Sequence, residues 1–476
     1  MRKIITISKY ILAAGLLIFL YPLSSCNKTL DIAPPVDQLT TTEVFMDSSS
    51  VENAILGAYA LQATFNFAST SFLCGNVTLY PGLSADELHK TAVSSLYTQF
   101  EQNAILSNNS LNESNWSSAY NLIYQCNLIL EKLPGAATIS ASQKLRVGSE
   151  AKFLRALNYF YLTNEYGRVA LTTSSDYSSN TLLSRSDTAD VYKQVIADLK
   201  DAEAGLGTTY PTVNKVRANK YAAAALLARV YLYQKDYADA VTEATTVLSS
   251  GMYSLATPAG AFLPNNSEAI LQLMPPSTTQ SIFSTPEGSL FVPAPAIYQI
   301  IPNYALTPGL VNSFENGDLR RTNWTVDQLI QGVNYTVPLK YKQQFAFSAA
   351  TQEWEIALRL ADCYLIRAEA QAFQNHLSDA IADLDQVRGR AGLPQIAGTD
   401  PGISQPDLVD TIFHECRIEF FTEWGHRWFD LKRTGRINSV MTAAKGSQWK
   451  PTAALFPIPH SEVLAAPNLG QNDGYN

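Results

Sequence analysis

The fold is decided by residues 219–250, which read NKYAAAALLARVYLYQKDYADAVTEATTVLSS. Small and apolar residues recur here every three or four positions, the spacing of one helix face, and the run is interrupted at Lys235-Asp236. The stretch therefore predicts two helices joined by a tight turn. The residues expected between them are Leu227, Ala228, Tyr231, Ala240, Ala244 and Val247.

A second stretch, residues 353–390, repeats this pattern, because Ala368 and Ala380 have the same spacing as Ala228 and Ala240. Small residues let paired helices approach, and an aromatic residue fills the groove between them, which is typical of a tetratricopeptide repeat. Chance similarity through alanine richness is the alternative. Further helices are expected from near residue 42 and at about 113–132, 141–166 and 187–204. The sequence thus predicts a mainly α, tetratricopeptide-like array of helix pairs with little β structure.

Residues 251–350 interrupt the array. They hold ten of the 23 prolines, and the alanine-rich periodicity stops. Short apolar runs such as residues 335–339 appear instead, and we expect a large irregular, loop-rich subdomain with a short hairpin. Residues 65–112 also read as loop-rich. Long ordered loops on a rigid scaffold commonly carry binding sites.

Composition narrows the class of protein. The chain has 476 residues, 46% of them hydrophobic, so it can build a large core and is not intrinsically disordered. Its 34 Lys and Arg against 42 Asp and Glu give a net charge of −8. This excess of acidic residues disfavours nucleic-acid binding, which needs a basic surface.

The N-terminus predicts a lipid anchor. A basic start and an apolar run over residues 10–23 indicate a signal peptide. Leu23-Ser24-Ser25-Cys26 follows and looks like a lipobox, with Cys26 as the lipidated residue; an ordinary secretory signal is the alternative. Cleavage removes 25 residues with three basic and no acidic side chains, which leaves 451 residues and a charge of −11. Pro34-Pro35 indicates that an extended tether comes next.

No catalytic, metal or cofactor motif is found. His414-Glu415-Cys416-Arg417-Ile418 lacks the second histidine of a zinc-protease helix, and neither a GxSxG elbow nor a P-loop occurs. Glu415, Glu419 and Glu423 recur every four residues, which predicts a structural ion-pair network with the nearby Arg417, Arg427 and Arg433. A glycosidase carboxylate pair stays open, since such pairs leave no short signature.

Four cysteines follow Cys26, and they are expected to be buried free thiols, with a disulfide at Cys74 left open. They are Cys74, Cys126, Cys363 and Cys416.

Residues 415–435, ECRIEFFTEWGHRWFDLKRTG, resemble the C-terminal signature of the SusD/RagB family of Bacteroidetes outer-membrane lipoproteins. Other stretches that resemble the family, at 151–167, 359–370 and 457–475, occur along the chain in the order expected for the family. Cys416 departs from the pattern, because a charged residue is usual there. The resemblance implies a SusD-like fold and a non-catalytic, cell-surface lipoprotein of the outer membrane. Such a protein forms a lid on a SusC-like TonB-dependent transporter and presents oligosaccharides, or in some members peptides, to it.

Together these observations predict five regions of the chain. They are a signal peptide (1–25), a lipidated tether (26–42), an N-terminal SusD-like helical region (43–250), an irregular ligand-binding subdomain (251–350) and a C-terminal SusD/RagB helical region (351–476). A glycan-binding lid is the leading hypothesis. A peptide-binding lid and a lipid-anchored glycoside hydrolase are the alternatives.

Ligand residues are expected in the two loop-rich stretches, because sugars bind to rings, amides and carboxylates held on loops. The candidates are Asn76, Tyr80, Asp86, Tyr97, Tyr298, Tyr304 and Trp324. Each ring could instead be a core residue, and Trp324 is preferred because its neighbours are polar. Residues 91–131 and 236–319 contain no Lys or Arg, which predicts a neutral glycan.

Overall fold

The computed structural model describes residues 44–63, 71–275, 284–345 and 352–475. The predicted signal peptide, the tether and Cys26 lie outside these ranges. Residues Phe45–Asn476 form one compact unit. No helix in the described ranges combines the length and the apolar character that crossing a bilayer requires.

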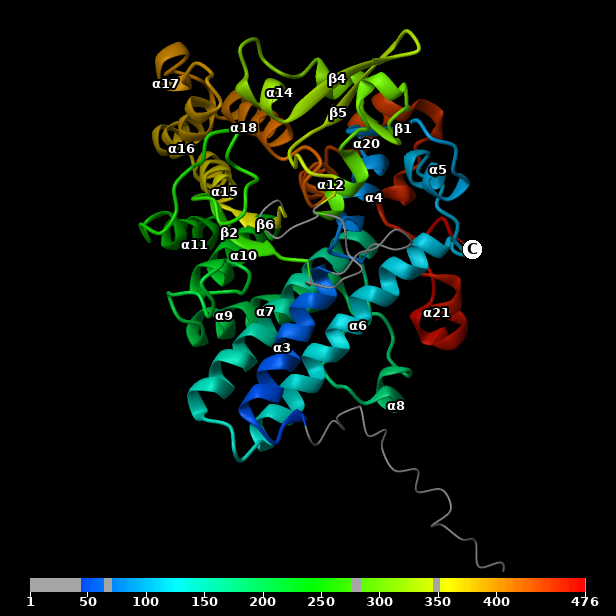
Figure 1. Ribbon diagram of the computed structural model, residues 1–476, viewed down its shortest axis with the longest axis vertical. Helices are drawn as coiled ribbons and strands as arrows, with labels where there is room; N and C mark the ends of the chain where they lie inside the picture. The colour runs from blue at the N-terminus through cyan, green and yellow to red at the C-terminus, as the bar shows by residue number, and fades with distance from the viewer. Residues whose placement is uncertain (1–43, 64–70, 276–283, 346–351, 476) are drawn as a thin grey trace, which may run out of the picture. The chain divides into compact units, whose positions relative to one another are not determined.

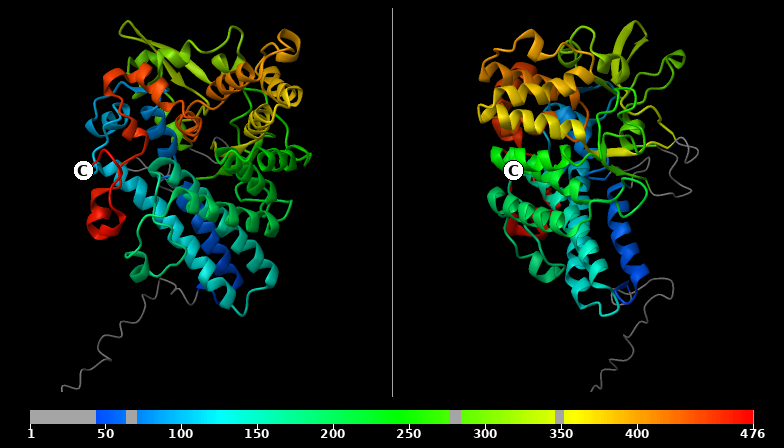
Figure 2. Two further views of the ribbon diagram at one scale, coloured as in Figure 1. Left: turned by 180° about the vertical axis from the view of Figure 1, so that it is seen from behind. Right: turned by 90° about the vertical axis from the view of Figure 1, so that its left-hand side faces the viewer.

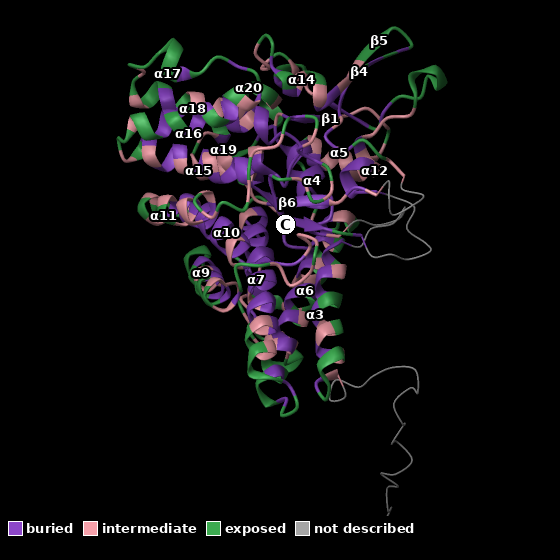
Figure 3. Ribbon diagram, turned by 60° about the vertical axis from the view of Figure 1, so that its left-hand side comes forward, coloured by how far each residue is buried: buried purple, intermediate pink, exposed green. Residues whose placement is uncertain are grey.

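Three long helices lie side by side in this unit (Figure 1): α3 (Ser48–Ala63), α6 (Ser110–Lys132) and α7 (Ala141–Tyr166). Asn109 caps α6 by accepting hydrogen bonds from the amides of Leu111 and Asn112, as residues of this type do at helix starts. From Val147 onward α7 is almost wholly buried, and α9 (Thr188–Gly205) packs against it (Figure 3). The four helices confirm the expected helical segments of the N-terminal region.

The predicted helix pairs are present. They are α10 (Lys220–Tyr233) with α11 (Tyr237–Leu248), and α15 (Leu360–Phe373) with α16 (Leu377–Arg390). Lys235 and Asn375 occupy equivalent positions in the two turns, with φ of 61° and 63°, which reverse the chain tightly. Because α11 also packs on α15, the two pairs stack into an array, and this confirms the mainly α fold (Figure 2).

One boundary of the second pair was predicted wrongly. Residues 355–359 continue the helical stripe in the sequence, but they form strand β6 (Glu355–Arg359), which pairs antiparallel with β2 (Ala269–Leu273). Every residue of both strands is buried. A short apolar run that is buried on both faces has no alternation to distinguish it from a buried helix.

The loop-rich stretches contain short elements. In the first are α4 (Asn76–Ser84), β1 (Leu88–Lys90) and α5 (Ser95–Glu101), so it is more ordered than predicted; Pro81 inside α4 obscured that helix. The second contains β2, α12 (Pro286–Phe291), η3 (Ala296–Tyr298), β3 (Tyr304–Leu306), α13 (Pro308–Val311), α14 (Leu319–Asn323), β4 (Thr325–Ile330) and β5 (Val333–Pro338). Strands β4 and β5 form the expected hairpin, and Gln331 and Gly332 take positive φ in its two-residue turn.

The C-terminal region is also helical. It contains α17 (Ile396–Thr399), α18 (Gln405–Glu419), α19 (His426–Arg433), α20 (Ile437–Lys445) and α21 (His460–Ala465). The remaining short helices are η2 (Leu133–Gly135), α8 (Tyr177–Asn180), η4 (Gly446–Gln448), η5 (Pro451–Ala454) and η6 (Pro467–Leu469).

Glu415, Glu419 and Glu423 belong to a buried ion-pair network, as predicted, but its cations are different. Glu419 pairs with Arg320, Arg359 and Arg390, three residues that are distant in the sequence. Burial alone would raise the pKa of Glu419, yet the three guanidinium groups hold it well below its usual range. The predicted cations have other partners: Arg417 and Arg427 pair with Asp86, and Arg433 pairs with Glu369 and Asp430. The four cysteines after Cys26 are buried and free, which confirms the expectation of thiols.

Candidate functional site

The two loop-rich stretches meet in a small sheet. Strand β1 pairs antiparallel with β3, with Leu88 opposite Leu306 and Lys90 opposite Tyr304. Backbone hydrogen bonds from Thr91 to Asn303 (3.0 Å) and from Thr307 to Glu87 (2.8 Å) extend the contact at both ends. Candidate ligand residues that are about 200 positions apart in the sequence are therefore neighbours.

Three predicted ligand residues belong to one aromatic cluster at this junction. The ring of Tyr97 lies 6.2 Å from Tyr80 and 6.0 Å from Tyr304, measured between centroids. Tyr80 and Tyr304 are buried, whereas Tyr97 is half-buried. Burial raises the pKa of the Tyr97 hydroxyl, and more strongly that of Tyr304, so both are neutral hydrogen-bonding groups at physiological pH. Tyr97 is the member of the cluster that a ligand can reach.

Tyr298 is 66% exposed, and η3, the short helix that it ends, contacts strand β4. Other exposed apolar side chains belong to the same parts of the chain: Ile297, Ile300 and Ile301 to the segment around η3, and Leu329 and Val333 to the β4–β5 hairpin. We call these six residues the Tyr298 surface.

Two hydrogen bonds connect these elements. The amide of Gln331 donates to Gln299 Oε1 (3.1 Å), and Gln328 Nε2 donates to the carbonyl of Ala294 (3.1 Å). An exposed tyrosine with amides nearby can stack on the C–H face of a sugar and bind its hydroxyls. The isoleucines were not predicted as part of a site, because apolar residues in a proline-rich loop are more often core.

Asp86 lies at the edge of a cavity of about 1140 Å³ between β1, α13 and α20. Its carboxylate accepts hydrogen bonds from Arg427 (2.8 and 3.0 Å) and from Arg417 (2.9 Å). Burial would raise the pKa of Asp86, but the Arg427 hydrogen bond and the two positive charges outweigh it and lower that pKa. Asp86 is thus engaged with two arginines, and Asn76 is buried within α4.

The polar setting predicted for Trp324 is wrong, because no part of this side chain is exposed. Its indole N–H donates to the carbonyl of Pro258 (2.7 Å), and its ring meets Phe262 edge-on at 5.4 Å. The ammonium of Lys340 lies 4.8 Å from the ring centroid. The neighbouring Arg320, which made the segment look exposed, is itself buried in the ion-pair network. A ligand cannot stack on Trp324 in this structure.

The site carries no arrangement typical of metal chemistry. Within the described ranges, no group of three His, Cys, Asp or Glu side chains could hold a metal ion. The buried carboxylates of Glu415, Glu419 and Glu423 each form an ion pair with a cation.

Comparisons with known proteins agree with this architecture. The model of the SusD family matches residues 309–475, and a family described as starch-binding and associating with the outer membrane matches residues 28–232. SusD-like protein P25 of Formosa agariphila is 24% identical over 95% of this chain and 96% of its own.

Solved structures show the same fold. A SusD superfamily protein from Parabacteroides distasonis superposes with a TM-score of 0.75 and 24% identity, and the match covers 92% of this chain and all of that one. A laminarin-binding SusD-like protein gives a TM-score of 0.72 and 24% identity over 90% of this chain and all of that one.

Proposed function

Because the chain belongs to the SusD/RagB family, we propose that it is an outer-membrane lipoprotein that binds a neutral oligosaccharide and delivers it to a SusC-like TonB-dependent transporter. Proteins of this family bind carbohydrate and catalyse no reaction, so the chain is not an enzyme. Lipidation of Cys26 would hold it at the cell surface, with the transporter as its partner.

The observation that carries the proposal is the Tyr298 surface. An exposed ring surrounded by aliphatic side chains matches the alternating C–H faces of a glycan. Two hydrogen bonds join the segment around η3 to the β4–β5 hairpin, and the same segment leads into β3, which pairs with β1. Ordered loops of this kind commonly carry binding sites. The ligand residues that we propose are Tyr298 on this surface and Tyr97 at the β1–β3 junction.

Charge supports a neutral ligand. Residues 292–303, which carry most of the Tyr298 surface, contain no charged side chain. The mature chain would also have a charge of −11, which repels uronates and sulfates. Binding should therefore change little between low and high salt.

A thermal-shift panel of neutral oligosaccharides, acidic oligosaccharides and tryptic peptides tests the class of ligand, followed by calorimetry at two salt concentrations. Tyr298→Ala should weaken the best glycan at least tenfold, about 1.4 kcal/mol, with an unchanged melting temperature. Tyr177→Ala is the matched control, since Tyr177 is 76% exposed on α8, far from the β4–β5 hairpin (Figure 1). Tight, salt-sensitive binding of an acidic polysaccharide would contradict the proposal.

The anchor is tested separately. Cys26→Ala should leave the protein in the periplasm or uncleaved, whereas Asn27→Ala should still fractionate with the outer membrane. If Cys26→Ala also reaches the outer membrane in cells that lack the transporter, then lipidation at Cys26 is not what holds it there.

A further inference from the structure

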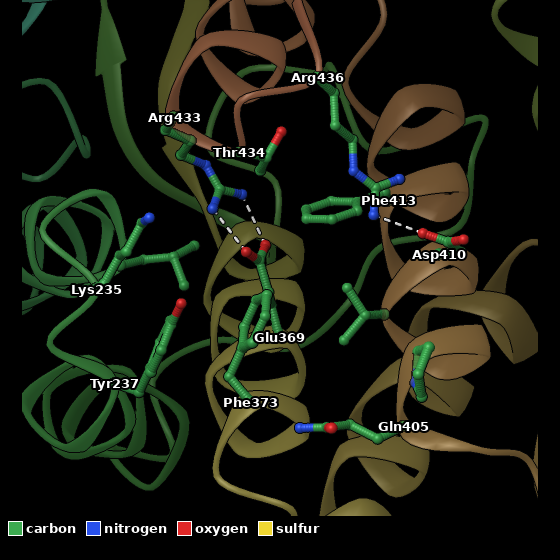
Figure 4. Close-up of a pocket in the computed structure, with 13 residues that line it drawn as sticks. Lys235, Tyr237, Glu369, Phe373, Gln405, Asp410, Phe413, Arg433, Thr434 and Arg436 are labelled. Carbon is green, nitrogen blue, oxygen red and sulfur yellow. Dashed lines mark hydrogen bonds and ion pairs between the residues drawn. The ribbon is translucent and has the colours of Figure 1, made fainter. Parts of the chain in front are cut away.

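Most buried carboxylates of this protein are paired with a basic side chain. Figure 4 shows one example, in which Arg433 donates to both oxygens of the buried Glu369 at 2.6 Å. Glu150, Glu268 and Glu419 also pair with arginines. Such pairing is expected, because a buried carboxylate without a cation or a set of donors is strongly unfavourable.

Glu287 of α12 and Glu355 of β6 are buried without a cation. They are 4% and 1% exposed, and neither forms an ion pair within the described part of the chain. The three internal ranges outside that part, 64–70, 276–283 and 346–351, contain no charged residue and so cannot supply one. No donor group reaches Oε2 of Glu287 or either oxygen of Glu355. Two ionised carboxylates are therefore not stable here.

Thr78 fixes one oxygen of the pair as an acceptor. The amide of Trp424 donates to Thr78 Oγ1 (3.0 Å), and the single hydroxyl proton of Thr78 is donated to Glu287 Oε1, 2.8 Å away. The carboxyl group of Glu355 forms a side-chain hydrogen bond with that of Glu287. A hydrogen bond between two carboxyl groups requires a proton on one of them. Glu355, whose oxygens have no other donor, is the group that carries it.

The surroundings of the pair favour this proton. Burial raises the pKa of both carboxyls, and the negative charge of Glu287 raises that of Glu355 further. A metal ion fits less well, since two carboxylates supply few of the six to eight oxygens that Ca²⁺ takes. The titratable groups whose charges act on the pair are all neutral or acidic: Tyr161 of α7, Tyr341 after β5, Cys74 before α4 and Glu423 after α18.

Helix α12 connects the pair to the candidate ligand cluster. Glu287 is in its first turn, and Phe291 is its last residue. The buried ring of Phe291 meets Tyr304 edge-on, with 6.2 Å between the centroids, and Tyr304 in turn contacts Tyr97 at 6.0 Å. The same short helix thus contacts β6 through one end and supports the β1–β3 junction with the other.

We propose that Glu287 and Glu355 share a proton that holds α12 against strand β6, and that the pair is a pH-sensitive positioning device for the β1–β3 junction. When the proton is lost, two buried carboxylates repel each other, and α12 separates from β6. The packing of Phe291 behind Tyr304 and Tyr97 is lost with it. The consequence for glycan binding rests on the proposed role of Tyr97, whereas the shared proton does not.

The proton makes stability depend on pH with a definite sign. The unfolded chain loses both protons near pH 4.3, whereas the folded pair keeps at least one at neutral pH, so stability falls as the pH rises. In urea titrations of the mature protein between pH 6 and 8, the unfolding equilibrium constant of wild type should rise about tenfold more per pH unit than that of Glu355→Gln. The amide introduced at this position can still donate to Glu287.

Glu131→Gln is the matched control for the titration. Glu131 is exposed and its pKa is lowered by hydrogen bonds from Ser175, so it is ionised in both the folded and the unfolded state throughout this range. Its variant should therefore keep the wild-type slope. Glu287→Gln, whose amide can donate to Glu355, should also give a shallower slope than wild type, and it carries the comparison if Glu355→Gln does not fold.

Hydrogen–deuterium exchange locates the effect in the fold. Amide protection in α12, corrected for intrinsic exchange rates, should fall about tenfold between pH 7 and 8 in wild type, and less in Glu355→Gln. Protection in α9 should change alike in the two proteins. Infrared difference spectra should show a protonated-carboxyl band that wild type loses at alkaline pH and that is smaller in Glu355→Gln.

Three results would each overturn the proposal. They are a wild-type slope in both Gln variants, a change of α12 protection that is the same in wild type and Glu355→Gln, and stabilisation of wild type by calcium chloride at pH 8 that Glu355→Gln lacks. Glycan affinity tests the proposed function separately. If the slopes and the exchange behave as expected but affinity is constant between pH 6 and 8, then the shared proton is supported and Tyr97 is not a ligand residue.

Discussion

Replacing Trp324 by Ala should destabilise the protein and leave its glycan affinity unchanged. The indole is fully buried, donates a hydrogen bond to Pro258 and lies against the ammonium of Lys340. Truncating a buried Trp costs about 3–5 kcal/mol. The unpaired carbonyl and the lost cation contact add roughly 1 kcal/mol each. We therefore expect a loss of about 5–7 kcal/mol in the free energy of unfolding.

The decrease in melting temperature that corresponds to this loss depends on the unfolding entropy, which scales with the number of residues that unfold together. The 432 residues from Phe45 to Asn476 have an unfolding entropy of about 0.9 kcal/mol/K if they unfold together. The expected decrease in melting temperature is then about 6–8 °C, measured by circular dichroism or differential scanning fluorimetry. Trp324→Phe keeps a ring and loses only the N–H donor and some area, so it should lower the melting temperature by about 1–2 °C.

Affinity measured well below the transition separates a core role from a ligand role. Trp324→Ala should bind the glycan as wild type does at 10 °C, while Tyr298→Ala should not. If Trp324→Ala melts within 1 °C of wild type and loses glycan affinity, then the ring contacts the ligand and its buried position is not the functional one.

Two further predictions concern charged groups. Arg427→Ala should lower the free energy of unfolding by about 2–3 kcal/mol in a urea titration, because Asp86 then keeps only one of its two partially buried cations. Glycan affinity should change little. Arg168→Ala is the control: it removes an exposed ion pair and should cost under about 0.5 kcal/mol in the same titration. Burial raises the pKa of Glu165 to about 8. In the folded protein this carboxyl therefore keeps a proton that the unfolded chain loses near pH 4.3. The contribution of Glu165 to the free energy of unfolding then falls as the pH rises toward 8. Glu165→Gln should therefore lose less stability than wild type between pH 6 and 8, by up to about 1.4 kcal/mol per pH unit, and equal slopes would contradict a buried neutral carboxyl.

The helix pairs could be predicted from sequence because their signal is local. The spacing of Ala228 and Ala240 sets one interface, and the interruption at Lys235 sets the turn. A short hairpin in the irregular subdomain could be expected from local apolar runs for the same reason, and β4 and β5 form one. Strand β6 was missed because a run buried on both faces has the same apolar content as the helix that follows it.

Contacts between distant residues could not be predicted in this way. The arginines nearest to Glu419 in the sequence were predicted to be its cations. Its ion-pair partners are instead Arg320 of α14, Arg359 of β6 and Arg390 of α16. Trp324 was misjudged similarly, since its polar neighbours are local while Pro258 and Phe262 lie more than 60 positions away. The meeting of β1 with β3 likewise depends on packing that no local pattern encodes.

The buried ion-pair network explains how an irregular subdomain can hold a ligand surface in place. Arg320 from α14 and Arg359 from β6 pair with Glu419, the last residue of α18, and Lys340 after β5 pairs with Glu423 four positions later. Separating any of them would leave a buried charge unpaired, which costs about 3–5 kcal/mol. The base of the hairpin is therefore fixed to the C-terminal helices, and two hydrogen bonds join the segment around η3 to the hairpin. The long charged signature contributes the carboxylates of this support, whereas the residues of the proposed ligand surface carry no signature because the fold does not require their identity.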